Sequence, residues 1–256
     1  MTSARIALLH LCLVPGAIER NRSLIVEAVK YAAGAGAQWI ITPELAVCGL
    51  QFAHFIGTDW IQPQPDPWMK RFCTLVKDLK RTVFLGYPER DGKGLYNSVF
   101  VINPHGEIIG RHRKVNVLSD SLSWSSAGEV TVPVECDGIR VGLLICSDLY
   151  APNLTGALKL RGADMLISPA SWGPGIHGPN GEWEARTRET GLALIVCNRT
   201  GAEKTLDFWK APSLVVKDGT RLLSHASDRS AVLTFDWNFT TMTPSGKGYQ
   251  TEYLKE

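Results

Sequence analysis

The 256-residue sequence lacks closely spaced cysteines, long hydrophobic runs and a marked charge excess of either sign. Its six cysteines are scattered without a CxxC pair, which argues against a disulfide framework or a zinc site. No run approaches the roughly 20 apolar residues that a membrane-spanning helix needs. A net charge of +2 is too small to indicate binding to nucleic acid or to an acidic membrane surface. We therefore expect no metal, no nucleic-acid partner and no membrane partner.

A signal peptide and an internal repeat are also missing. The chain enters a strand-like segment directly, without a basic region or a cleavage site, so we expect a cytoplasmic protein with reduced cysteines. At this length one large α/β domain is expected, and no linker divides the chain. We place this domain at residues 1–240. The polar tail, 241–256, is predicted to be either disordered or part of a subunit interface.

Hydrophobic periodicity predicts strands that alternate with helices along the whole chain. Strands are expected at 5–13, 39–42, 82–87, 96–103, 107–111, 165–168, 193–198, 212–217 and 231–236, and helices at 18–35, 68–80, 154–161 and 182–191. Hairpins and βα units occur in the same chain. This mixture predicts an α/β fold in which two sheets pack together with helices outside.

One cysteine, Cys146, stands out because it ends the apolar run GIRVGLLIC of residues 138–146. Such a run predicts a buried strand whose carboxyl end presents the thiol at the edge where open α/β sheets place their ligands. A cysteine in this position is more often a small buried hydrophobic residue than a nucleophile. The catalytic interpretation therefore depends on partners.

Two upstream segments end in the same manner. Residues 38–44 form an apolar strand that ends in Pro43 and Glu44, and residues 108–114 form another that ends in the basic group HRK with Lys114. A carboxylate can act as the base for a thiol, and an ammonium can stabilise the oxyanion that forms when the thiolate attacks a carbonyl. Taken singly, Glu44 is predicted to be a helix N-cap or a solvated charge, and Lys114 to be one member of a basic loop. Together with Cys146 they predict acyl transfer through a thioester.

With these three segments the sequence resembles the nitrilase, or carbon–nitrogen hydrolase, superfamily, in particular its amidase-like branch. The segments that carry the resemblance are ITPELAVCGL (41–50), HRK (112–114), LLICSDL (143–149), SPASW (168–172), RTRET (186–190), NRTG (198–201) and APSLVVKDG (211–219). They occur in the family's order and cover most of the chain. The resemblance implies a four-layer α-β-β-α sandwich, catalysis by Glu44, Lys114 and Cys146, no cofactor, and a homodimer or larger assembly.

Several positions depart from the family pattern. Many members carry a second glutamate between the Lys and the Cys, where this chain has Ser121 or Leu122. The nearest acid, Asp120, is either an auxiliary carboxylate or a solvated turn residue. Ser147 stands where the family usually has a larger residue, which leaves room for substrate beside the thiol. Its backbone N–H is expected to serve as an oxyanion donor.

The expected reaction is hydrolysis of a non-peptide amide of a small molecule to a carboxylic acid and ammonia or an amine. Trp172, after the strand next to the nucleophile strand, either lines the substrate pocket or is a buried structural side chain. Three alternatives stay open. The chain is a nitrilase, an acyl- or amidotransferase with the same three residues, or a non-catalytic binding or regulatory protein that retains the fold.

Overall fold

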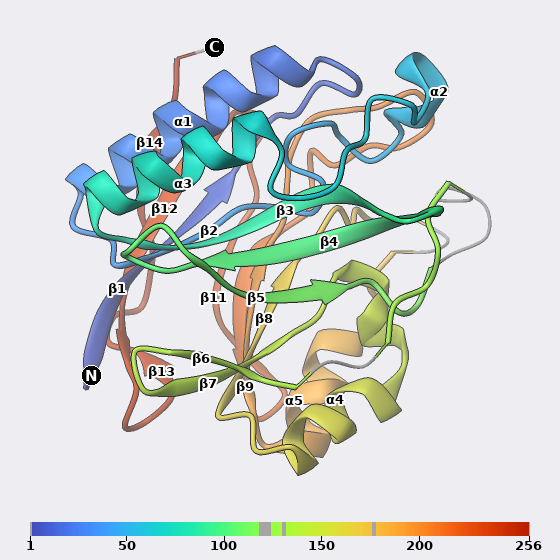
Figure 1. Ribbon diagram of the computed structural model, residues 1–256. Helices are drawn as coiled ribbons and strands as arrows, with labels where there is room; N and C mark the ends of the chain where they lie inside the picture. Colours follow the sequence, from blue (N-terminus) through green and yellow to red (C-terminus); the bar gives the residue numbers. More distant parts are fainter. Residues whose placement is uncertain (1, 118–123, 130–131, 176–177, 256) are drawn as a thin grey trace.

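The computed structural model describes residues 2–117, 124–129, 132–175 and 178–255, and within these residues the chain forms two β-sheets with helices outside them (Figure 1). The first sheet contains β1 (Ser3–His10), β2 (Trp39–Ile41), β3 (Thr82–Asp91), β4 (Gly94–Ile102), β5 (Ile108–Arg113), β12 (Ala231–Asn238), β13 (Thr243–Pro244) and β14 (Gln250–Tyr253). The second contains β6 (Val134–Cys136), β7 (Ile139–Leu143), β8 (Met165–Pro169), β9 (Ala193–Cys197), β10 (Ser213–Lys217) and β11 (Thr220–His225).

Helices cover the outer face of each sheet. Figure 1 shows α1 (Ile18–Gly34) and α3 (Pro67–Leu79) together on the first sheet, and α4 (Pro152–Leu160) and α5 (Glu182–Thr190) together beside the second. The short helix α2 (Ala53–Ile56) lies in a loop, and a 3-10 turn, η1 (Cys146–Tyr150), follows β7. The prediction of a four-layer α-β-β-α sandwich is therefore confirmed. No helix in the described residues is long and apolar enough to cross a bilayer.

The order of strands explains why the central strands are apolar on both faces. Parallel β1, β2 and β3 occupy the middle of the first sheet, and parallel β7, β8 and β9 the middle of the second. On β1, Ile6 and Leu8 point into the core between the sheets, whereas Ala7 and Leu9 pack under the outer helices. Strands buried on both faces read as continuous apolar runs, as this sequence does.

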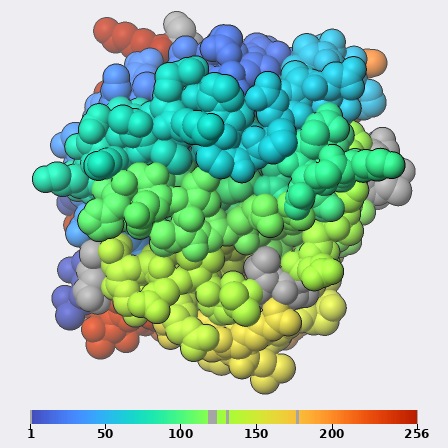
Figure 2. All heavy atoms as spheres, viewed as in Figure 1, coloured from blue at the N-terminus to red at the C-terminus, as the bar shows by residue number. Residues whose placement is uncertain are grey.

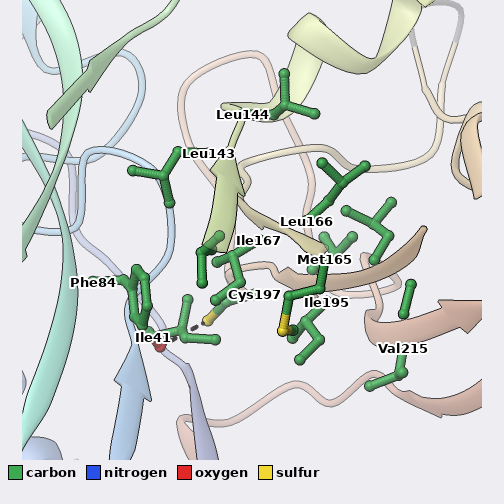
Figure 3. Close-up of a cluster of buried hydrophobic side chains, with 14 of the residues drawn as sticks. Ile41, Phe84, Leu143, Leu144, Met165, Leu166, Ile167, Ile195, Cys197 and Val215 are labelled. Atoms are coloured by element: carbon green, nitrogen blue, oxygen red, sulfur yellow. Dashed lines mark hydrogen bonds between the residues drawn. The ribbon is translucent and has the colours of Figure 1, made fainter. Parts of the chain in front are cut away.

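The two sheets meet in a closely packed core. In Figure 3, Ile41 and Phe84 of the first sheet face Leu143, Ile167 and Cys197 of the second. The Cys197 thiol donates to the backbone oxygen of Ile41 at 3.1 Å, which links β9 to the strand that precedes Glu44. On the face shown in Figure 2, the green atoms of the segment near residue 100 lie directly against the yellow-green atoms of the segment near residue 140.

One glycine allows β3 to approach the segment that carries Glu44. A Cβ atom on Gly86 would lie 2.2 Å from the backbone oxygen of Pro43 and 3.2 Å from the Cα of Glu44. The approach is fixed by hydrogen bonds from the Gly86 N–H to the Thr42 hydroxyl at 2.9 Å and from the Ala46 N–H to the Gly86 oxygen at 3.1 Å. Any side chain at this position must move the Glu44 segment.

We expect Gly86→Ala to lower the free energy of unfolding by about 1–3 kcal/mol, because the added methyl group overpacks a site lined by backbone. Urea denaturation followed by tryptophan fluorescence measures the change. Gly156→Ala is the matched control, because nothing lies within 4 Å of its added Cβ and it sits in α4. Alanine there should stabilise by about 0.5–1 kcal/mol. Equal midpoints for the two variants would contradict the close approach.

Candidate active site

Three side chains predicted from the sequence come together between the sheets. Glu44 follows β2, Lys114 follows β5, and Cys146 begins the η1 turn after β7. The three residues are 1%, 2% and 6% exposed, respectively. Because β2 and β5 belong to one sheet and β7 to the other, the packing of the sheets is what brings the three ends of strands together.

The Glu44 carboxylate is held by donors on both of its oxygens. Oε1 accepts from Lys114 Nζ at 2.7 Å and from Asn97 Nδ2 at 2.7 Å. Oε2 accepts from the backbone N–H of Ser171 at 2.9 Å. Asn97 also fixes the lysine segment, because its backbone oxygen accepts from the Lys114 N–H at 2.8 Å. The sequence analysis missed Asn97 and Ser171.

The backbone at Cys146 adopts the left-handed conformation, with φ at +48°. This conformation costs a non-glycine residue about 1–3 kcal/mol and occurs often at active sites. The thiol faces the Glu44 carboxylate and the Ser171 backbone N–H. Burial raises the pKa of the Cys146 thiol, the Glu44 charge raises it further, and the Lys114 charge opposes the rise. The resting sulfur is therefore a neutral thiol.

Lys114 carries the positive charge of the site. Burial alone would lower the pKa of its ammonium group, but the charge of Glu44, the hydrogen bond that Lys114 donates to Glu44 and the charge of Asp148 raise it above its ordinary value. The side chain thus stays protonated although it is 2% exposed. A carboxylate, a thiol and an ammonium group thus lie close together, and acyl transfer through a thiol needs groups of these three kinds.

Two further predicted site residues, Ser147 and Trp172, directly follow Cys146 and Ser171 in the chain. The Ser147 hydroxyl donates to the backbone oxygen of Asn116 at 2.7 Å, and Asn116 Nδ2 donates to the Ser147 oxygen at 2.7 Å. Ser147 is thus tied to the lysine loop. Trp172 is 4% exposed and packs edge-on against Tyr150 and Trp183, with ring centroids 4.9 and 5.4 Å away.

Asp120, Ser121 and Leu122 lie outside the described residues. Within the described part of the chain, no group of three or more His, Cys, Asp or Glu side chains has the arrangement of a metal site. Surface hollows of 350 and 410 Å³ are lined by residues of α1, α3 and the neighbouring loops, away from Cys146. The buried trio is therefore distinct from both hollows.

A glutamate, a lysine and a cysteine buried between the sheets of an α-β-β-α sandwich are the arrangement that the resemblance to the nitrilase superfamily implies. The chain belongs to the carbon-nitrogen hydrolase family, whose sequence profile matches residues 5–244. It is thus a hydrolase that acts on carbon–nitrogen bonds, and the resemblance found in the sequence is confirmed. A nitrilase of Pyrococcus abyssi is 29% identical over 213 residues, which cover 82% of this chain and 80% of the relative.

Solved structures share the fold over nearly the whole chain. An amidase from Nesterenkonia sp. superposes with a TM-score of 0.78 at 25% identity, covering 93% of this chain and 91% of the amidase. A Saccharomyces cerevisiae member of branch 10 of the nitrilase superfamily gives a TM-score of 0.81 at 20% identity, covering 93% of this chain and 90% of the relative. The yeast structure bears on the fold alone.

Proposed function

We propose that this protein hydrolyses a non-peptide amide of a small molecule through a thioester on Cys146. The observation that carries the proposal is the buried contact of three groups. The Glu44 carboxylate accepts from Lys114 Nζ at 2.7 Å, the Cys146 thiol hydrogen-bonds to Glu44, and both charges act on the thiol pKa. A neutral thiol next to a carboxylate has a base for its proton, and the fixed ammonium next to it favours the negative charge that then develops.

In the first half of the proposed reaction, Glu44 takes the thiol proton as sulfur attacks the amide carbon. A carbon–sulfur bond forms and the carbonyl oxygen becomes an oxyanion, which Lys114 and the Ser147 backbone N–H stabilise. The oxyanion collapses and the carbon–nitrogen bond breaks. Glu44 returns the proton to the departing nitrogen, which leaves as ammonia or an amine and leaves a thioester behind.

In the second half, water attacks the thioester carbon and Glu44 takes its proton. A carbon–oxygen bond forms, the carbon–sulfur bond breaks, and the proton returns to sulfur, so a carboxylic acid is released and the resting thiol restored. The 6% exposure of Cys146 favours a small acyl group. The Nesterenkonia amidase supports the nucleophile, because Glu-to-Gln variants of that amidase carry acrylamide or the acetamide moiety of fluoroacetamide at its active-site cysteine.

The substrate is tested by ammonia release from matched amides and nitriles of short aliphatic and aromatic acids. Release from the amides that disappears in Cys146→Ala supports the proposal, whereas release from the nitriles alone would replace it by the nitrilase reaction. Hydroxamate formation with added hydroxylamine, without hydrolysis in its absence, would indicate an acyltransferase. The same three residues act in each of these outcomes, but the substrate, amide or nitrile, or the acceptor of the acyl group, water or an amine, differs.

Reactivity of Cys146 toward iodoacetamide tests the trio without a substrate, and the two charge variants should shift it in opposite directions. Glu44→Gln removes the negative charge that raises the thiol pKa, so more thiolate should exist at a given pH and alkylation should speed up near neutral pH. Lys114→Met removes the opposing cation, so the thiol pKa should rise further and alkylation should slow. Amide turnover should fall in both. Mass spectrometry gives the rate at each cysteine from pH 6 to 10.

Cys73 is the internal control, because it is partly buried and burial alone raises its pKa. Its alkylation rate should be the same in all three proteins. If the alkylation rate of Cys146 is the same in the wild type and in both variants, the catalytic proposal fails. A non-catalytic binding protein that retains the fold would then be the better interpretation.

A further inference from the structure

We propose that His112 is a positioning residue. By donating a hydrogen bond to Asp148, it fixes the position of Lys114 relative to Cys146. This inference deepens the function proposed above and rests on it. The starting point is Asp148, which is completely buried two positions after the nucleophile. Burying a carboxylate costs free energy unless hydrogen-bond donors surround it. The donors to Asp148 therefore indicate which parts of the chain this carboxylate holds together.

Four donors reach Asp148 from the two segments that carry Cys146 and Lys114. Oδ2 accepts from His112 Nε2 at 2.8 Å and from the Ile145 N–H at 2.9 Å. Oδ1 accepts from the N–H groups of Val115 and Asn116 at 2.9 and 2.8 Å. One carboxylate therefore joins the residue before the nucleophile to the two residues after the lysine.

His112 supplies the side-chain donor of this set. It is 1% exposed near the end of β5, two positions before Lys114, and both side chains point inward, whereas Arg113 between them pairs with Glu89 and Asp91. Burial would raise the Asp148 pKa, but the His112 hydrogen bond, its charge and the backbone donors together lower it. Asp148 therefore stays ionised, and its negative charge also supports the protonated state of Lys114.

The hydrogen bonds to Asp148 determine how firmly Lys114 is held. The backbone donors fix the loop after Lys114 to the η1 turn, and the imidazole fixes the strand before Lys114 to the same carboxylate. Lys114 is thus held from both sides of the chain. Without the imidazole, β5 and the η1 turn lose one of their links, and the Lys114 ammonium is free to move relative to the thiol.

The test compares His112→Gln with His112→Met. The two side chains are similar in length, but only glutamine places an N–H donor near the position of imidazole Nε2. In the Gln variant, Cys146 alkylation by iodoacetamide and kcat should stay within about threefold of wild type. In the Met variant both should fall about 10- to 100-fold, because a small displacement of reacting groups has that cost. KM should change less than twofold in both, which a general loss of structure would not produce.

A replacement variant and a pH profile complete the test of the positioning role. If the Met variant does not fold, His112→Asn replaces it, because its shorter amide withdraws the donor while keeping the polarity. The pH midpoint of Cys146 alkylation should be the same in wild type and in the Gln variant. Equal rates in the Gln and Met variants, or a shifted midpoint in the Gln variant, would overturn the positioning role. An unreactive wild-type Cys146 would instead overturn the proposed function, so the two failures are distinguishable.

Discussion

Replacing Cys146 by alanine is expected to reduce kcat/KM for a cleaved amide by at least about a thousandfold, because the proposed reaction passes through a bond to this sulfur. Glu44 and Lys114 would remain paired at 2.7 Å, since Glu44 also keeps its hydrogen bonds from Asn97 and Ser171. The free energy of unfolding should change by about 1 kcal/mol or less, because only one sulfur atom is removed. Ammonia release and urea denaturation measure the two quantities.

The matched control is Cys73→Ala, which removes a partly buried thiol outside the site and should leave kcat/KM unchanged. A Cys146→Ala protein that keeps more than about a tenth of wild-type activity would contradict the thioester route. Glu44 would then have to activate water directly on the amide. A large loss of stability in Cys146→Ala would instead assign the residue a structural role, so the two measurements must be made together.

The fold was predictable because its signals are local. The helix expected at 18–35 is α1 at Ile18–Gly34, and the strand expected at 39–42 is β2 at Trp39–Ile41. Hydrophobic periodicity fixes such elements over a few residues. Polar β14 escaped detection, since Gln250–Tyr253 is held by pairing with β12 and its side chains are mostly exposed. Backbone hydrogen bonds at a sheet edge leave no pattern in the side chains.

The three proposed catalytic residues could be predicted from the sequence, but the groups that contact them could not. Each of the three residues ends a strand-like segment, which the sequence indicates, and the family resemblance adds that they converge. The residues that the sequence did not single out act through contacts distant in the chain. Asn97 is 53 positions from its partner Glu44, and Ser171 is 127 positions from it. Such partners depend on how the two sheets face each other, which no local pattern encodes.

A second buried charge pair supports the loop that follows Glu44. Arg199 is fully buried and pairs with Glu203. Its Nη2 donates to the Leu13 oxygen at 2.5 Å, and its guanidinium carbon lies 4.6 Å from the centroid of the Phe208 ring. Burial lowers the Arg199 pKa, and the charge of Glu203 and its hydrogen bond oppose this shift. Glu203 in turn accepts from the backbone N–H groups that follow Gly49, those of residues 50 and 51, at 2.9 and 2.6 Å.

Arg199→Met is therefore expected to lower the free energy of unfolding by about 3–5 kcal/mol, because it leaves the Glu203 carboxylate buried without its cation. Urea denaturation measures the loss, and the matched control is Arg5→Met. Arg5 pairs with Asp236 at 2.8 Å on the surface, with side chains 32% and 54% exposed, so its removal should cost about 1 kcal/mol or less. Similar costs for the two variants would mean that Glu203 finds other compensation. A much larger cost at Arg199 would show that the stability of the fold depends on this buried pair, whose Glu203 also holds the N–H groups of residues 50 and 51 after Glu44.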